Sequence, residues 1–447
     1  MEENTQPNPP KTIEWPKSQS FSFYRAILKH PIIRDFQTLM AGYPQVMADH
    51  GFDARYQEIY FHLKSKLLEY SFKKDEDYHY AKTPWKDYVL SEIISDENPL
   101  NLLFERGPVS LHHPFISSML GEFQIFLDLY HFDWATFLAN TGLDEDNIFD
   151  SLIFFTLPPH NAMGEAFETR NVHKIFGAVN QYIHEYGLGI FENNVCFKIN
   201  REGHLSPIPA RVYKSMDALI GYDRQKNELI ANTASFIQSY TGLNVLLQGD
   251  MGTGKSTMVK ALLDTFSDTK LRMIEFKKDE IALMPSVISK IKDRPYPFIL
   301  FIDDLSFDDK EGDFKLFKNI LEGSLEDNPK NVLIYATSNK RHLVTETMSE
   351  RTDAVHTKDI MEEKLSLSSR FGLVLTFGSP DQKEYLNIVN RMAEEAGIDM
   401  PQAQLETKAL QWELRHLNRS GRTAEQFIEY LLVGKHKNKF KKGHSPE

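Results

Sequence analysis

The stretch Asn244-Val-Leu-Leu-Gln-Gly-Asp-Met-Gly-Thr-Gly-Lys-Ser-Thr257, continued by Met258-Val-Lys-Ala-Leu-Leu263, decides the fold. An apolar run, a glycine loop and a run of good helix formers follow one another, which predicts a strand, a tight loop and a helix. The spacing G-x-x-x-x-G-K-[ST] is met by Gly249, Gly254, Lys255 and Ser256. This spacing is typical of loops that bind a phosphate chain.

Each residue type in this loop has a chemical reason. Glycines let backbone N–H groups curl around phosphates, the Lys255 ammonium reaches the outer phosphates, and the Ser256 hydroxyl binds Mg²⁺. The following helix presents the positive end of its dipole to the same anion. We therefore expect ATP and Mg²⁺ as cofactors. The nucleotide-binding residues would be Gly249, Asp250, Met251, Gly252, Thr253, Gly254, Lys255, Ser256 and Thr257. A glycine turn without a ligand is the alternative, which the flanking strand and helix disfavour.

Length and composition indicate a globular protein of several domains. A chain of 447 residues is too long for one ordinary core, and its 41% apolar and 26% charged residues are typical of soluble proteins. No apolar stretch reaches the ~18 residues of a membrane span, and the N-terminus lacks the basic and apolar regions of a secretion signal. The single cysteine, Cys196, excludes an internal disulfide and a cysteine-based zinc site. We expect a cytoplasmic protein without membrane contact.

The net charge of −12 is unevenly distributed. Residues 1–200 hold about 16 basic and 27 acidic side chains (net −11), and residues 201–447 hold the remaining 35 and 36 (net −1). The N-terminal half is therefore a poor candidate for binding a phosphate backbone, so nucleic acid is a possible partner that the charge does not favour.

The N-terminal part predicts helices and no identifiable chemistry. Residues 1–16 are polar and proline-rich, which predicts a disordered tail. Aromatic and aliphatic residues at helical spacing then predict a mostly α-helical domain over residues 17–205, ending in a hairpin with Gly203 in its turn. No pair of its histidines has the spacing of helical metal ligands, so we interpret them as surface or core residues. The histidines considered are His112, His113, His160 and His173.

After a linker near residues 206–214, strands alternate with helices, which predicts a parallel sheet flanked by helices over residues 206–378. The expected strands are 245–247, 271–276, 296–304, 331–337 and 373–377, and the expected helices are 223–240, 258–263, 280–291 and 314–325. Residues 344–364 are polar without a clear period, which favours a mobile loop. Residues 379–433 predict a helical lid with helices 381–396, 401–416 and 421–433, and residues 434–447 a basic disordered tail.

Polar residues end two of these strands. Asp303 and Asp304 close the apolar run that starts at Tyr296, and Asn339 follows the next strand. Because ligands bind at the carboxyl ends of parallel strands, these side chains should face the glycine loop. We expect Asp303 to bind Mg²⁺ through its water shell and Asp304 to orient or deprotonate the attacking water. The neutral amide of Asn339 can hydrogen-bond that water or the γ-phosphate.

Together with this order of motifs, Ser-Ser-Arg370-Phe-Gly and Ser-Gly-Arg422 make the C-terminal half resemble the AAA+ P-loop ATPases. In detail, Asp217-Ala-Leu-Ile-Gly-Tyr-Asp-Arg-Gln225, Phe-Ile-Asp-Asp-Leu-Ser-Phe307 and Tyr-Ala-Thr-Ser-Asn-Lys-Arg-His342 resemble the bacterial family domain of unknown function 815, over about residues 206–433. The resemblance implies a Walker A loop at 249–256 and a Walker B pair at 303–304. It also implies a sensor 1 at Asn339, an arginine finger at Arg370 and a sensor 2 at Arg422, with Asp304, Asn339, Arg370 and Arg422 as catalytic residues.

Two departures limit what the resemblance implies. Most AAA+ enzymes have Glu where this chain has Asp304, and a shorter carboxylate lies farther from the water, although replication-initiator-like members also have Asp-Asp. No aromatic-hydrophobic-glycine pore loop lies between Phe276 and Ile291, so polypeptide threading is not favoured.

These features lead to one main hypothesis and three alternatives. We expect an ATPase that drives a conformational or assembly switch, forms homo-oligomers through ATP-dependent interfaces and acts on an unknown protein partner. An ATP-binding interaction module with little turnover is the first alternative, and a nucleic-acid or helicase-loader-like switch is the second. A small-molecule or nucleotide kinase shares the glycine loop but does not need Asn339, Arg370 or the lid.

Overall fold

The structure is a computed structural model, and it divides the chain into two compact units, residues 1–193 and 194–447. The described residues are 21–49, 54–73, 79–143, 146–152, 162–200, 202–208, 214–305, 311–322, 329–339, 369–416 and 418–442. The predicted N-terminal tail, the predicted loop 344–364 and most of the predicted linker lie outside them. Within the described residues, no helix is both long and apolar enough to cross a membrane.

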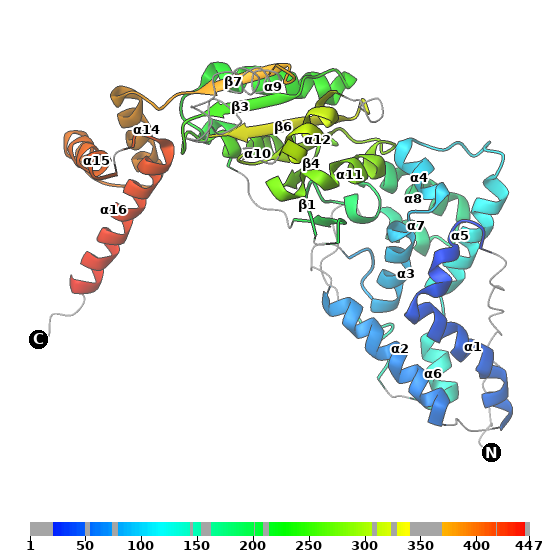
Figure 1. Cartoon of the computed structure of the whole chain (residues 1–447). Helices are drawn as coiled ribbons and strands as arrows, with labels where there is room; N and C mark the ends of the chain where they lie inside the picture. Colours follow the sequence, from blue (N-terminus) through cyan, green and yellow to red (C-terminus); the bar gives the residue numbers. More distant parts are fainter. Residues whose placement is uncertain are drawn as a thin grey trace, which may run out of the picture. The chain divides into compact units, whose positions relative to one another are not determined.

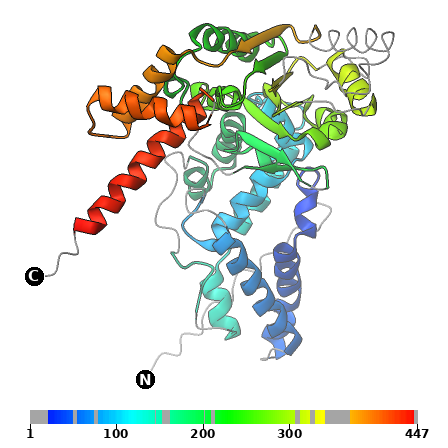
Figure 2. The ribbon, with the colours of Figure 1, turned by 60° about the vertical axis from the view of Figure 1, so that its left-hand side comes forward.

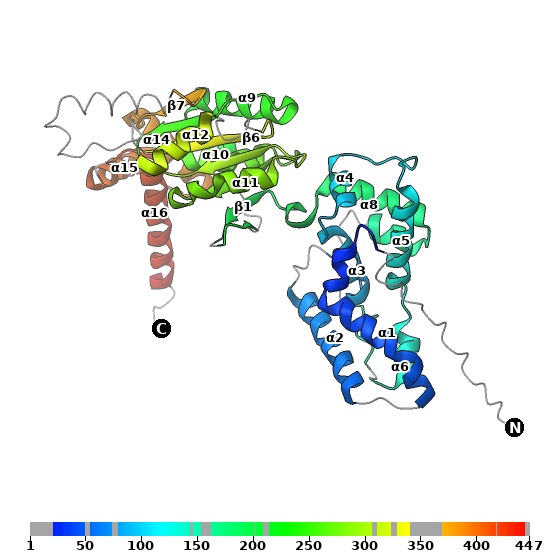
Figure 3. The same ribbon diagram turned by 45° about the vertical axis from the view of Figure 1, so that its right-hand side comes forward.

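The described part of the first unit is helical (Figures 1 and 3). Its α-helices are α1 (Pro31–Asp49), α2 (Ala54–Lys73), α3 (Pro84–Ser95), α4 (Pro99–Arg106), α5 (Ile116–Tyr130), α6 (Trp134–Thr141), α7 (Ala162–Glu168) and α8 (Val172–Tyr186), with short 3₁₀ turns η2 (Arg25–Lys29) and η4 (Gly189–Phe191). Prolines open α1, α3 and α4 because a proline at the first helical position gives up an N–H that has no partner there anyway. The predicted helical N-terminal region is confirmed.

Aromatic packing forms the core of this unit. Trp85 and Trp134 are fully buried, and the Trp134 ring stacks on Phe149 with centroids 3.8 Å apart. Phe36 contacts both tryptophans. Rings of this size each bury on the order of 150–250 Å², so a few of them supply much of the core.

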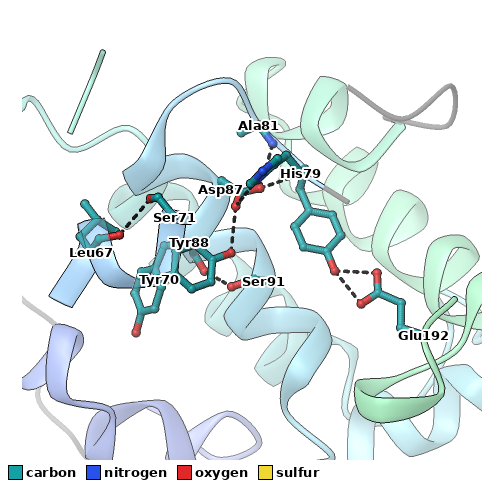
Figure 4. Close-up of polar contacts among 10 residues, drawn as sticks. Leu67, Tyr70, Ser71, His79, Ala81, Asp87, Tyr88, Ser91 and Glu192 are labelled. Carbon is teal, nitrogen blue, oxygen red and sulfur yellow. Dashed lines mark hydrogen bonds and ion pairs between the residues drawn. The ribbon is translucent and has the colours of Figure 1, made fainter. Parts of the chain in front are cut away.

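A buried carboxylate ties α2, α3 and the loop between them together (Figure 4). Asp87 of α3 is fully buried and accepts hydrogen bonds from the Tyr70 hydroxyl at 2.8 Å and the Tyr80 backbone N–H at 2.6 Å. His79 Nδ1 lies 3.1 Å from the same carboxylate. Because an unpaired buried carboxylate would be costly, these donors fix the position of α2 against α3.

The second unit is built on a seven-stranded sheet with the order β2-β1-β4-β5-β6-β3-β7. The strands are β1 (Cys196–Ile199), β2 (Leu205–Pro207), β3 (Val245–Gly249), β4 (Arg272–Phe276), β5 (Phe298–Ile302), β6 (Val332–Ser338) and β7 (Leu373–Phe377). All neighbouring pairs are parallel except β1 and β2. Every residue of β5 is buried, as expected for a strand covered on both faces.

The hairpin of β1 and β2 belongs to this sheet. The sequence pattern predicts it at the end of the N-terminal domain, but β1 pairs in parallel with β4, so the hairpin extends the sheet of the second unit. The sequence pattern predicts the hairpin itself, whereas the β1–β4 pairing joins residues about 75 positions apart and leaves no local signal.

Helices flank the sheet and form the lid (Figures 1 and 2). They are α9 (Asp223–Ser239), α10 (Lys255–Thr265), α11 (Met284–Ile291), α12 (Glu311–Glu322), α14 (Gln382–Glu395), α15 (Gln402–His416) and α16 (Gly421–Lys442), with 3₁₀ turns η5 (Met216–Ala218) and η6 (Lys278–Leu283). The predicted helix 280–291 is divided into η6 and α11, and Pro285 lies in the first turn of α11, where a proline is tolerated. The predicted α/β fold class with a helical lid is confirmed.

The disorder predicted for residues 434–447 is wrong for residues 434–442, where α16 continues without a break to Lys442. Lysine is a good helix former, and positive charge near the last turn complements the helix dipole. A run of basic residues, which is typical of a solvated tail, is therefore equally compatible with the last turns of a long helix.

Candidate functional site

The glycine loop connects β3 to α10, as its sequence predicts, but its three glycines serve different purposes. A Cβ on Gly249 would lie 1.9 Å from the carbonyl oxygen of Phe377, so only glycine lets β3 and β7 pair this closely. Gly252 and Gly254 have φ of +77° and +89°, in the left-handed region that favours glycine. Gly254 is the N-cap of α10, where N–H groups without partners begin.

Lys255 is the first residue of α10 and is 5% exposed. Its ammonium donates to the carbonyl oxygens of Gly249 at 2.9 Å and Asp250 at 2.7 Å, and to Oδ1 of Asn339 at 3.1 Å. Burial lowers the pKa of Lys255, and the carboxylates of Asp250, Asp304 and Asp303 oppose this shift. The lysine therefore lies within the loop, held by acceptors that a phosphate oxygen could replace.

The two aspartates follow β5, as predicted, and face the loop. Ser256 Oγ donates to Asp303 Oδ1 at 2.5 Å, so the two residues expected to bind the cation are in contact. Asp304 is exposed and has φ of +56°, a conformation that is strained for a residue with a side chain. Its carboxylate accepts from Asn339 Nδ2 at 2.8 Å. The predicted neighbours Asp303, Asp304 and Asn339 are thus brought together.

Thr337 is a residue of the candidate site that no sequence motif predicts. Its hydroxyl donates to Asp303 Oδ1 at 2.7 Å and accepts from the backbone N–H of Asp304 at 2.9 Å. Because side chains alternate along a strand, Thr337 lies on the same side of β6 as Asn339, two residues later. That spacing in Ala-Thr-Ser-Asn is the signal that could have identified it.

The lid contacts the glycine loop directly. The N–H of Arg422 lies 3.4 Å from the carbonyl oxygen of Gly252, and a Cβ on Gly252 would lie 2.7 Å from Ser420 Oγ. Asp250 Oδ2 accepts from both the N–H (2.9 Å) and the hydroxyl (2.7 Å) of Ser379, at the junction of β7 and α14. Nothing in the sequence indicates the contacts made by Ser379 and Ser420.

Arg370 is the predicted site residue that the structure leaves apart from the others. It is exposed and precedes β7 by three residues. Strand β7 pairs in parallel with β3, from Val245↔Leu373 to Gly249↔Phe377. Arg370 therefore lies at the amino ends of these strands, whereas the glycine loop lies at their carboxyl ends. Four residue steps of about 3.3 Å, roughly 13 Å, separate the two ends of β7 alone.

The donor set fits a magnesium ion and a nucleotide. Ser256 and Asp303 offer hard oxygen ligands within contact of each other, and Mg²⁺ is usually bound by one or two such groups together with phosphate oxygens. Across the described residues, no cluster of three or more histidine, cysteine or acidic side chains offers a separate metal centre.

The second unit has the fold of the AAA+ class of P-loop proteins, as its sheet order, glycine loop, acidic strand end and helical lid indicate. A family model described as Protein of unknown function (DUF815) matches residues 192–436. The chain belongs to this family.

The comparisons with other proteins add little to this assignment. No curated protein matches the chain. Among solved structures, the RuvB Holliday junction branch migration motor of Thermotoga maritima is 17% identical with a TM-score of 0.33, covering 49% of this chain and 72% of the motor. Two mutant forms of the same motor give the same values. A TM-score of this size says nothing about what this chain does.

Proposed function

We propose that this chain binds ATP with Mg²⁺ and hydrolyses it to drive a conformational or assembly switch that acts on a partner protein. The observation that carries the proposal is the hydrogen-bonded group at the carboxyl ends of β3, β5 and β6. Lys255 contacts Asn339, Asn339 contacts Asp304, and Ser256 contacts Asp303. These are the charges and amides that nucleotide hydrolysis requires, within hydrogen-bond distance of one another.

Each residue of this group has a separate role in the proposed reaction, which its position determines. Lys255 exchanges loop carbonyls for phosphate oxygens, which its low exposure and nearby acceptors favour. Ser256 and Asp303 would hold the magnesium ion, which neutralises charge on the phosphates when it is bound. Asp304 orients the attacking water and accepts its proton, while the Asn339 amide fixes the orientation of the Asp304 carboxylate.

We propose that Arg370 completes the site of a neighbouring copy. An arginine at the amino ends of the strands cannot reach a nucleotide that its own chain binds at their carboxyl ends. Arg422, in contrast, lies in the first turn of α16, which touches the loop. A guanidinium is suited to the charge that develops on a transferring phosphoryl group. Hydrolysis would then depend on a homo-oligomer in the cytoplasm.

An ATP-binding interaction module with little turnover is the second candidate. It is favoured by Asp304, whose short carboxylate is engaged by Asn339 at 2.8 Å and has less reach toward a water than a glutamate. A nucleic-acid or loader-like role remains an alternative to a protein partner, and the acidic first half of the chain disfavours it.

Replacement of Asp304 tests the proposal. Asp304→Asn keeps an oxygen that can accept from Asn339 but cannot take a proton, so ATP affinity should be unchanged while turnover falls by roughly 10²-fold or more. Asp303→Ala is the matched comparison, because it should weaken the Mg²⁺ dependence of binding instead. Turnover and calorimetric affinity are measured on both. Wild-type turnover in Asp304→Asn would remove Asp304 from catalysis, and negligible turnover in the wild-type oligomer would favour the binding module.

A further inference from the structure

Helix α2 of the first unit has an apolar stripe that is exposed among the described residues of that unit. Phe61 is 50% exposed and Phe72 is 80% exposed, although both are large hydrophobic side chains. They are eleven residues apart, which is three helical turns, so they lie on one side of the helix with Ser65 and Leu68 between them. We call these four residues the α2 stripe.

The opposite side of α2 is fixed in the core, so the helix cannot turn to bury the stripe. Tyr60, Leu63 and Leu67 are fully buried. Tyr70 donates to the buried Asp87, and the Ser71 hydroxyl donates to the Leu67 carbonyl (Figure 4). Helix α2 packs beside α1 and lies at the margin of the helical unit in two views (Figures 1 and 3). Rotation of α2 would therefore expose its buried side, so the described core holds the stripe facing outward.

We propose that the α2 stripe binds the α2 stripe of a second copy of this chain, with the two helices antiparallel. The stripe is complementary to itself about a twofold axis between Lys66 and Leu67. In that register Phe61 meets Phe72 of the second copy, and the small Ser65 meets the larger Leu68. Such a pairing is isologous, because the same surface serves both partners.

Charge supports this register. Glu58 lies on one flank of the stripe near the start of α2, and Lys73, which forms an ion pair with Glu69 in its own helix, lies on the same flank at its end. An antiparallel twofold pair brings each flank beside the same flank of its mate, so each Glu58 meets the Lys73 of the other copy. A parallel pairing would instead bring each flank beside the opposite flank of its mate and leave Glu58 and Lys73 at opposite ends of the two helices, so this ion pair could not form.

The size of the stripe predicts a weak association. Two phenylalanines and a leucine from each copy bury less than the ~1,200 Å² of total surface that stable interfaces need. We therefore expect dissociation in the micromolar range or above, which matters most when two chains are already held together by other contacts.

Sedimentation equilibrium of the full chain without nucleotide tests the pairing, over about 5 to 200 µM because the association is weak. Wild-type protein should show a monomer–dimer equilibrium, and Phe72→Ser should weaken it at least about tenfold, since it removes the most exposed ring of the interface. Phe115→Ser is the matched control, because Phe115 is 61% exposed but lies outside α2, and its dimerisation should equal that of the wild type.

A charge exchange tests the register. Glu58→Lys and Lys73→Glu should each weaken the dimer, and the double variant should restore it, because the pair is re-formed with its signs reversed. Wild-type protein that remains monomeric, or Phe72→Ser that associates like the wild type, would overturn the proposal. Loss of dimer in Phe72→Ser without rescue by the charge exchange would overturn the antiparallel register. A change in the unfolding of monomeric Phe72→Ser would show that the stripe is covered within one chain.

Discussion

The Thr337 hydroxyl connects the two aspartates of the site, donating to Asp303 and accepting from the Asp304 backbone. This single group helps to hold the two adjacent carboxylates in different directions. Asp303 is directed toward Ser256, while the positive φ of Asp304 turns its carboxylate toward Asn339. Strain at a non-glycine residue persists only where the surroundings enforce it, and here the threonine and the asparagine do so.

Glu92, a largely buried residue of α3, should make the stability of the first unit depend on pH. The Glu92 side chain of α3 is 14% exposed, and its pKa is raised to about 7, chiefly by burial and further by Asp96, against a hydrogen bond with Tyr88. His30 Nε2 lies 3.7 Å from its carboxylate. Below the unfolded pKa near 4.5 the group is protonated in both states, so it costs nothing there.

Glu92→Gln should remove this pH dependence. As pH rises from 4.5 to about 7, unfolded Glu92 releases a proton that the native state retains, so wild-type stability falls by up to ~3 kcal/mol relative to the variant. Urea unfolding at pH 5 and pH 8, followed by hydrogen exchange of α3 peptides, measures the difference. Glu165→Gln, at an exposed position of α7 in the same unit, is the control. An equal difference between wild type and Glu92→Gln at both pH values would contradict the assignment.

The sequence predicts individual site residues where they belong to the glycine-loop motif or follow the end of a predicted strand. Lys255, Ser256, Asp303, Asp304 and Asn339 were expected together and lie within hydrogen-bond distance as a connected group. Their chemical roles stay predictions. The partners Ser379 and Ser420 could not be found, because they come from segments more than 120 residues from the loop and serine carries no local signal.

At the level of elements, α16 is positioned by the glycine loop. Its first turn packs against Gly252, where a Cβ would lie 2.7 Å from Ser420 Oγ and 3.3 Å from Arg422 Cβ. Asp250 clamps the start of the lid through Ser379. Because the glycine loop touches both the start of the lid and the start of its last helix, a change in the loop on the proposed nucleotide binding should move the lid.

Gly252→Ala tests this coupling. The added methyl group should push the start of α16 away from the loop, so ATP affinity should fall and protease cleavage in the lid should increase. Gly252→Ala with Ser420→Gly removes the collision and leaves only the cost of the positive φ, about 1 kcal/mol. Partial recovery of affinity in calorimetry is therefore expected. If the double variant binds no better than Gly252→Ala, contact with the lid is not what the glycine provides.

Element boundaries were predictable where a period or a proline marks them. The strand expected at 373–377 coincides with β7, and the helix expected from Asp223 matches α9 within one residue. The end of α16 was missed because lysine runs occur in both helices and solvated tails, and composition alone does not separate these. The strand order was not predicted, because β3 pairs with β6 and β7, which are distant in sequence.

At the level of the whole molecule, a single copy of the second unit brings together the expected site residues at the glycine loop, with the exception of Arg370. The glycine loop, both aspartates, Asn339 and the start of α16 lie at one end of the strands, whereas Arg370 lies at the other end. A surface pairing of Arg370 would contribute at most about 1 kcal/mol and leave catalysis unaffected. A finger acting on a neighbour would instead contribute on the order of 10³ to 10⁵ in rate.

Mixing two inactive variants tests the central claim most directly. Lys255→Ala should bind no nucleotide, and Arg370→Ala should bind ATP but not hydrolyse it. Mixed in equal amounts, random assemblies pair an intact loop with an intact finger at roughly a quarter of their interfaces, so the ATPase rate should recover to about that fraction of the wild-type rate. No recovery on mixing, together with wild-type specific activity that is independent of protein concentration, would contradict action in trans.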